Sequence, residues 1–326
     1  MCNKLGYEVS VYDDGTQFLE RLLFFKKHRS NKGRFHFRIR QRLIHLIKDI
    51  RLVRKLKQAD LVILSECIPN AYWRGLFGIE ELRKVVRKPI CLYEVYYLGN
   101  SDTHTNLLKF NRHHDVNRYD WNFSVSAVTE KKGVPSLTLK WSVIGLDLHD
   151  TGLQPCKKEF IALLDFAQPG FEDERKMQLD ALEELNIKTI LLEGEYSMAE
   201  IREQYKAAAV LFIQFPEAFG MPIAECLSTG TNILLPDINW AMSWRKENES
   251  GEHYLPSCFT KYDSAVDLKE KLTRMRETFD SHQTPLQTNA VFMDHYGSFF
   301  NGDPASLETA VQHMLTAKDT SKKVHY

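Results

Sequence analysis

Two carboxylates eight positions apart flank a short glycine-containing segment in the second half of the chain. The segment runs Phe-Pro-Glu-Ala-Phe-Gly-Met-Pro-Ile-Ala-Glu, and its acids are Glu217 and Glu225. Carboxylates accept hydrogen bonds from paired hydroxyl groups such as those of a sugar or a ribose. Gly220 lets the backbone approach a ligand without a Cβ in the way, and Pro222 suits a first helical turn because it has no N–H. The segment therefore predicts hydroxyl recognition beside backbone N–H donors.

This segment stands where a strand passes into a helix. Residues 210–214 are an apolar run typical of a buried strand, and residues 222–229, ended by Gly230, are typical of a short helix. Ligands of an open parallel sheet bind outside the carboxyl ends of its strands. A helix N-terminus at that edge attracts anions through its free N–H groups and its dipole. We therefore expect a phosphate or another anion at the same place.

Strands alternate with helices along the whole chain, which indicates parallel sheets and an α/β fold. In the first half we predict strands at residues 8–12, 59–64, 89–95 and 122–128, with helices at 35–57 and 76–86. In the second half we predict strands at 160–166, 189–192, 210–214 and 232–235, with helices at 174–185, 197–208 and 222–229. The boundary falls near residues 147–155. We expect domains at 1–147 and 148–304, with a helix and tail at 305–326 that can cross back to the first domain.

Length and composition fit a soluble protein of two domains. The chain has 326 residues, 43% of them hydrophobic and 26% charged, and no stretch approaches the roughly 20 apolar residues that span a bilayer. The first residues lack the pattern of a secretory signal, so we expect the chain to be cytoplasmic. Six scattered cysteines without a Cys-x-x-Cys pair argue against a zinc site or a disulfide framework.

The two spaced glutamates, the Phe-Gly-Met-Pro between them and the small residues up to Gly230 and Thr231 resemble a known motif. It is the donor-site motif of retaining GT-B glycosyltransferases of the glycogen-synthase-like, family 4 kind, also known as group 1 glycosyltransferases. The resemblance covers residues from about Asp120 to Trp240. It implies GT-B architecture, in which two Rossmann-like domains with parallel sheets face each other across a cleft.

The resemblance also implies roles for single residues. Glu225 would hold the ribose of a donor nucleotide, and Glu217 would act at the donor sugar as the catalytic residue. Further donor-binding positions would be Phe219, Gly220, Met221, Pro222 and Ile223. The plainer alternative is that Glu217 is a capping acid and Glu225 a solvated helix residue.

Two departures from the family pattern concern the diphosphate and the start of the chain. The family places an Arg and a Lys about five residues apart after the first strand of its second domain. Here only the adjacent Arg175 and Lys176 could bind the diphosphate, and both could instead be solvated residues that pair with Glu172 or Asp180. The strand, glycine-rich turn and helix that begin the family fold have no counterpart before residue 5, so we expect the first domain to lack this unit.

Two other clusters have residue types that could bind something. From Arg21 to Lys57 the chain carries fourteen Lys and Arg and one acid, which suits an anionic membrane surface better than nucleic acid, or else a solvated helix face. His104, His113, His114 and Asp115 have the residue types of a metal site but are more simply explained as loop residues.

The sequence contains no P-loop, no Gly-x-Gly-x-x-Gly, no Gly-x-Ser-x-Gly and no strand-end Asp-x-Asp. We therefore expect neither a cofactor nor a catalytic metal. By resemblance, the chain transfers a sugar with retention from a nucleotide sugar such as a UDP- or GDP-sugar. The acceptor would be a glycan or a lipid-linked molecule of surface polysaccharide or lipopolysaccharide synthesis. Alternatives are a degenerate relative that only binds or scaffolds, or an epimerase or phosphorylase of the same architecture.

Overall fold

The computed structural model describes most of the second half of the chain and parts of the first. The described residues are 1–10, 54–65, 79–94, 118–126, 140–215, 217, 219–238 and 243–321. The basic stretch lies outside them up to residue 53, and so do His104, His113, His114 and Asp115. What the sequence predicts for those residues stays a prediction.

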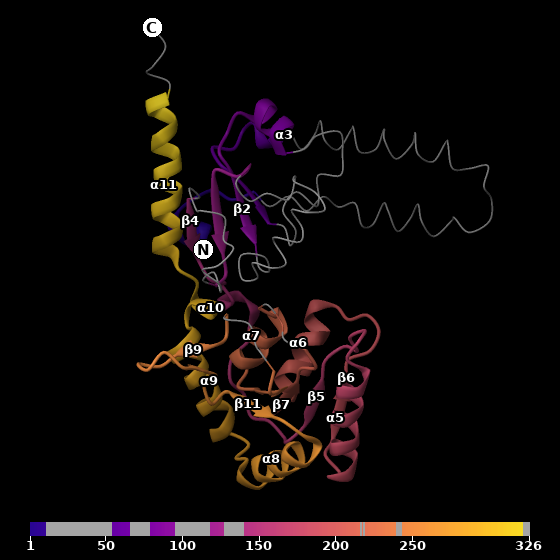
Figure 1. Ribbon diagram of the computed structural model, residues 1–326. Helices are drawn as coiled ribbons and strands as arrows, with labels where there is room; N and C mark the ends of the chain where they lie inside the picture. The colour runs from indigo at the N-terminus through magenta and orange to yellow at the C-terminus, as the bar shows by residue number, and fades with distance from the viewer. Residues whose placement is uncertain are drawn as a thin grey trace, which may run out of the picture.

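Four parallel strands form the first sheet in the order β1-β2-β3-β4 (Figure 1). Their bounds are β1 Val62–Ser65, β2 Ile90–Glu94, β3 Trp121–Ser124 and β4 Trp141–Val143. Helix α3 (Ile79–Val86) packs on this sheet, because Ile79 and Leu82 share a buried cluster with Val62 and Ile90. Three strands of this half were predicted to within a few residues, and the described end of the predicted 35–57 helix, residues 54–56, is helical.

The start of the chain differs from the prediction of a strand at residues 8–12. Residues 8–10 belong to no strand, and a short 3-10 helix, η1 (Cys2–Leu5), precedes them. Tyr7 instead packs against a hydrophobic cluster that contains Leu307 and Val311 of the last helix, and its hydroxyl accepts a hydrogen bond from Gln312 Nε2 at 3.0 Å. For residues 8–10 the strand prediction was wrong, because contacts with a distant helix outweigh local strand propensity.

Five parallel strands form the second sheet, in the order β11-β8-β7-β5-β6. Their bounds are β5 Ala162–Leu164, β6 Thr189–Leu191, β7 Val210–Phe212, β8 Asn232–Pro236 and β11 Phe259–Tyr262. When the five strands are numbered in chain order, the sheet has the doubly wound strand order 2-1-3-4-5. The direction in which strands are added reverses between strands 1 and 3. These strands are β5 and β7, so the topology itself marks the edge at which a ligand is expected.

Alternating side chains of this sheet pack on helices at its two faces. Leu163 and Leu211 belong to a buried cluster with residues of α6 (Met198–Ala207) and α7 (Met221–Ser228). Ala162, Leu164 and Phe212 belong to another cluster, with residues of α5 (Glu172–Glu184) and α8 (Ala265–Thr278). The strands read as continuous apolar runs because both faces of the sheet are covered. The prediction of an α/β fold with parallel sheets is confirmed for both halves.

The elements between β8 and the final helix were not predicted from the sequence. They are a two-stranded hairpin, β9 (Lys246–Glu247) with β10 (His253–Tyr254), the strand β11, and the helices α8, α9 (Gln283–Tyr296) and α10 (Ser298–Asn301). Among the described residues, no helix combines the length and the apolar composition that a membrane span requires.

The last helix, α11 (Pro304–Ser321), lies beside β4 of the first sheet although it follows the second sheet in the chain (Figure 1). Leu307, Val311 and Met314 of α11 form a buried cluster with Cys91 and Phe123 of the first sheet. The two sheets are thus joined by the segment after β4 and again by the segment between α9 and α11.

Candidate functional site

The carboxyl ends of β5 and β7 meet where the strand order of the second sheet reverses. Asp165 follows β5, and Gln214 lies two residues after β7; both are buried. Gln214 Nε2 donates a hydrogen bond to the backbone carbonyl oxygen of Asp165 at 3.2 Å, so the two strand ends are tied together. Ligands of open α/β sheets bind outside the strand ends at such a point.

The two cations predicted for the diphosphate point in different directions. Arg175 lies in the first part of α5, and its guanidinium donates to the backbone carbonyl oxygen of Asp165, at the end of β5. Lys176 pairs with Asp180 at 2.9 Å, and its side chain is 75% exposed. Arg175 is therefore beside the strand ends, whereas Lys176 is in the solvated ion pair that the sequence left open as the alternative.

The loop from Glu217 to Met221 brings backbone N–H groups to the same edge. Helix α7 begins after Gly220, whose φ of 73° is in the left-handed region that favours glycine. Within the described residues, no hydrogen bond satisfies the N–H groups of Phe219, Gly220 and Met221. Pro222, in the first turn, has no N–H to satisfy. These three N–H donors at a helix N-terminus are well suited to an anion.

Glu217 lies directly against this helix start. A Cβ atom added to Gly220 would lie 2.5 Å from Oε2 of Glu217 and 3.0 Å from Cδ1 of Ile223, so any larger residue would displace the Glu217 carboxyl group from its present position. The side chains of Phe219 and Ile223 are buried in the core. Both side chains are apolar and pack in the core cluster, so these two predicted donor-binding residues can offer hydrogen bonds to a ligand only from their backbone atoms.

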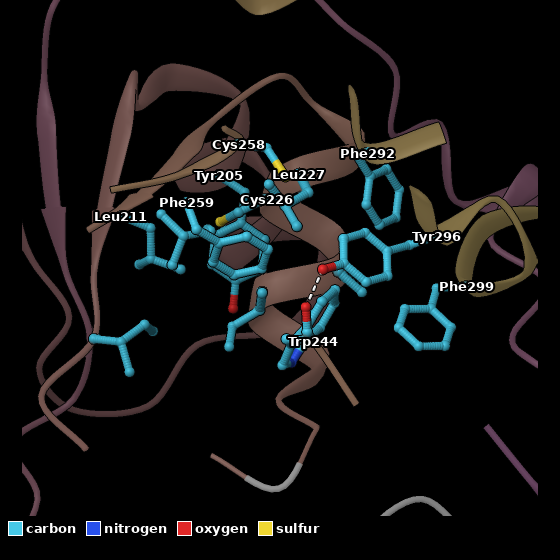
Figure 2. Packing of buried hydrophobic residues seen from close by; sticks show 14 of the residues in the cluster. Tyr205, Leu211, Cys226, Leu227, Trp244, Cys258, Phe259, Phe292, Tyr296 and Phe299 are labelled. Carbon is cyan, nitrogen blue, oxygen red and sulfur yellow. Dashed lines mark hydrogen bonds between the residues drawn. The ribbon is translucent and has the colours of Figure 1, made fainter. Parts of the chain in front are cut away.

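Buried aromatic rings, among them Trp244, Tyr296 and Phe299, form a cluster that also contains Phe219 of the loop; Figure 2 shows the first three. Trp244 Nε1 donates to the carbonyl oxygen of Phe219 at 2.5 Å, and the two rings stack with their centroids 5.2 Å apart. The Phe299 ring packs edge-on against Phe219, and the Tyr296 hydroxyl donates to the carbonyl oxygen of Trp244. Sequence reasoning missed Trp244, which is 25 residues from Phe219 and belongs to no local motif.

Two acids at this edge have pKa values above their ordinary range. Burial raises the pKa of Glu217 to about 7, and the charge of Asp165 adds to this effect. The pKa of Asp165 is also raised by burial, although the Phe166 N–H donates to its Oδ1 at 2.8 Å. Near neutral pH Glu217 is therefore only partly ionised, and its protonated form can donate a hydrogen bond to a ligand oxygen. Within the described residues, no cluster of three or more His, Cys, Asp or Glu side chains could hold a metal ion.

Glu225 is buried one turn into α7 and already has a cationic partner. Its side chain is 3% exposed, and its Oε1 accepts hydrogen bonds from Arg202 Nε at 3.1 Å and Nη2 at 2.7 Å. Glu225 is thus not the solvated helix residue of the plainer alternative. Arg202, on α6, was not among the predicted residues, and no spacing rule connects it with a residue 23 positions away.

Another buried cation, Lys158, supports the elements around the site. Its Nζ donates to the carbonyl oxygens of Tyr205 and Lys206 in the last turn of α6, at 3.0 and 2.9 Å. It also donates to the hydroxyls of Thr229 and Thr231, in the turn between α7 and β8, at 3.1 and 3.0 Å. Burial lowers the pKa of Lys158 to about 8. This residue fixes α6 and α7 relative to β5, which it precedes.

No family model matches the chain, and no curated protein does. Solved structures that resemble it remotely include the following three. HepE of Anabaena, in complex with UDP and glucose, is 12% identical, with 83% of this chain and 81% of that chain covered and a TM-score of 0.46. Sucrose-phosphate synthase of Thermosynechococcus elongatus is 14% identical, with 90% and 81% covered and a TM-score of 0.47. Trehalose 6-phosphate synthase of Burkholderia multivorans is 10% identical, with 91% and 79% covered and a TM-score of 0.44.

Proposed function

We propose that this protein is a GT-B glycosyltransferase that transfers a sugar from a nucleotide sugar to a glycan or lipid-linked acceptor. The observation that carries the proposal is the helix start at the strand-order reversal. There the free N–H groups of Gly220 and Met221 stand beside Glu217, on the sheet edge that also holds Arg175. This arrangement combines donors for a diphosphate with a carboxyl group for sugar hydroxyls. The order of residues matches the family motif found in the sequence.

In this proposal the leaving diphosphate is bound by the N–H groups at the start of α7 and by Arg175. Charge develops on the leaving phosphate as the glycosidic bond breaks, so fixed donors stabilise the transition state more than the ground state. Lys176 pairs with Asp180 on the solvated side of α5, which leaves Arg175 as the better supported of the two cations. No metal or cofactor is part of this mechanism.

In this proposal the two glutamates bind the donor sugar and the ribose. Glu217, with a pKa of about 7, can donate a proton to a sugar oxygen or accept a hydrogen bond from a sugar hydroxyl. Glu225 accepts a hydrogen bond from the ribose. Transfer with retention at the anomeric carbon follows from the family resemblance alone.

The acceptor side of the proposal rests on charge. The basic stretch from Arg21 to Lys57 would hold the protein at the inner face of an anionic membrane, next to a lipid-linked acceptor of surface polysaccharide or lipopolysaccharide synthesis. Each Lys or Arg near such a surface contributes about 1 kcal/mol of attraction. In this part of the proposal the protein is cytoplasmic and peripheral.

One observation favours a second candidate, a relative that binds a nucleotide sugar without transferring it. Asp165 places a buried carboxyl group at the strand end where a diphosphate would lie. An ionised Asp165 would repel the diphosphate, so binding at this edge requires a proton on the acid or the charge of Arg175 nearby. A site that relies on a proton on Asp165 or on the charge of Arg175 can bind a nucleotide sugar without releasing its nucleoside diphosphate.

Calorimetric titration with UDP, GDP and their common sugars tests the proposal. The unaltered protein should bind one nucleotide and its sugar, and Arg175→Gln should weaken binding about tenfold or more, because a hydrogen bond to a charged group is lost. Lys176→Gln is the matched control and should bind normally. Failure of the unaltered protein to bind any nucleotide would contradict the proposal. Binding without release of the nucleotide from its sugar, in the presence of lipid-linked acceptors, would favour the second candidate.

A further inference from the structure

The buried pair formed by Arg202 and Glu225 uses only one of the two carboxylate oxygens. Both hydrogen bonds from Arg202 end on Oε1, at 3.1 and 2.7 Å. Within the described residues, Oε2 of Glu225 accepts no hydrogen bond. A carboxylate has acceptor capacity on both oxygens, and a pair that served only to join two helices would gain from a bidentate fork on both. The geometry leaves one oriented acceptor free.

The pair belongs to the same edge of the sheet as the other acids of the site. Arg202 and Tyr205 are three positions apart on α6 and so lie on one face of this helix. Burial raises the pKa of the Tyr205 hydroxyl, and the charges of Glu217, Glu225 and Asp165 are among the further causes. Helices α6 and α7 are in contact, and Glu225 lies one turn from the start of α7. Side chains on α6 and α7 also lean toward the helix N-termini, which begin at this edge.

We propose that Arg202 is a positioning residue for nucleotide binding: it fixes Oε1 of Glu225 and turns Oε2 toward a ribose hydroxyl of the donor. This inference rests on the proposed function, and it adds a residue to which neither the motif nor the resemblance gives a role. A buried carboxylate without a hydrogen-bond partner can rotate about its Cγ–Cδ bond. The two hydrogen bonds from Nε and Nη2 of Arg202 fix Oε1 of Glu225 and therefore the plane of the carboxylate, and neither of them ends on Oε2.

The test compares binding of a nucleoside diphosphate with binding of its 2′,3′-dideoxy form, for both UDP and GDP. The unaltered protein should bind the ribose form about tenfold more tightly, because a hydrogen bond to a charged acceptor is made only there. Arg202→Met should bring this ratio close to one and leave affinity for the dideoxy form unchanged. Glu225→Gln should lower the ratio in the same way. Arg202→Lys should retain part of it.

Two further variants separate positioning from folding. Arg202→Met leaves a buried charge unpaired, so the double variant Arg202→Met/Glu225→Met, which removes both charges, serves as a folded reference that should bind both forms equally. Lys206→Met, on the same helix, loses only an ion pair with Glu203 and should keep the full ratio. If Arg202→Met keeps the ratio, the inference alone is overturned. If the unaltered protein binds UDP or GDP but shows no ratio, the inference fails together with the ribose role proposed for Glu225. If the unaltered protein binds no nucleotide, the proposed function fails and the inference fails with it.

Discussion

At the scale of single residues, the proton on Glu217 links the site to pH. In the folded protein the pKa of Glu217 is about 7, above its ordinary value of 4.5, because the group is buried beside Asp165. Between these two values the folded protein holds a proton that the unfolded chain has lost. The free energy of unfolding therefore falls as pH rises from about 4.5 to about 7, and the loss is complete above that range.

Glu217→Gln should remove this pH dependence. The variant cannot ionise, so relative to the unaltered protein it should gain stability on the order of 2 kcal/mol at pH 8 and little or nothing at pH 4. Urea unfolding at the two pH values measures the difference directly. Glu195→Gln, at an exposed position, is the control and should change stability equally at both. A Glu217→Gln variant that follows the pH profile of the unaltered protein would show that Glu217 does not carry the proton.

At the scale of elements, local signals predicted most of the second sheet. Ser197 caps α6 and forms a capping box with Glu200, and the apolar runs of β5, β7 and β8 are buried on both faces, so period and caps agreed with the structure. Strand β11 was missed because it is a four-residue strand whose pairing with β8 is set by tertiary contact. Helix α8 has a local signal that could have predicted it, a Ser264 cap followed by Leu268 and Leu272.

Some residues of the candidate site could also be predicted from the sequence, and others could not. Glu217, Gly220 and Glu225 could be predicted because they belong to one contiguous strand-loop-helix segment, and their separate roles stay predictions. Arg202 and Trp244 could not be predicted, because they are 23 and 25 positions away in the sequence from the residues that they contact, Glu225 and Phe219. Contacts of that separation follow from topology, and neither residue type alone indicates them.

The turn between α7 and β8 offers a test of how tightly these elements pack. Gly230 has a φ of 81°, and a Cβ atom there would lie 2.3 Å from the backbone oxygen of Pro285 in α9. The obstacle is backbone and cannot rotate away. Gly230→Ala should therefore destabilise the protein by about 3 kcal/mol or more, from the positive φ and the clash together. Chemical denaturation measures this loss.

Gly170 is the matched control for this substitution. Its φ is 90°, and no heavy atom beyond its chain neighbours lies within 4 Å of a Cβ placed there. Gly170→Ala should cost only the conformational strain, about 1–2 kcal/mol. Equal losses at the two positions would mean that α9 yields to the methyl group and does not fix the turn.

At the scale of the whole molecule, the segment after β4 and the segment around α10 run together between the two sheets. Leu146 N donates to Ser298 O at 3.1 Å, and Asp303 N donates to Ile144 O at 2.8 Å. Gly145 has a φ of 64°, and a Cβ atom on it would lie 2.0 Å from the Ser298 oxygen. The two segments are thus in backbone contact, and α11 continues from them onto the first sheet.

Because α11 supplies part of the core beneath the first sheet, a charge on its buried face should loosen that sheet selectively. Val311 is 4% exposed and packs with Phe123 and Ile144. Val311→Asp should cost about 3 kcal/mol or more, since an unpaired carboxylate would have to be buried or α11 released. Hydrogen exchange should show lost protection in β3 and β4, while β5 and β7, packed on other helices, keep theirs. Thr309→Asp, on the exposed side of α11, should leave exchange unchanged. Two results would contradict this role of α11. One is the same exchange in Val311→Asp and Thr309→Asp, and the other is a loss of protection in β5 and β7 together with β3 and β4.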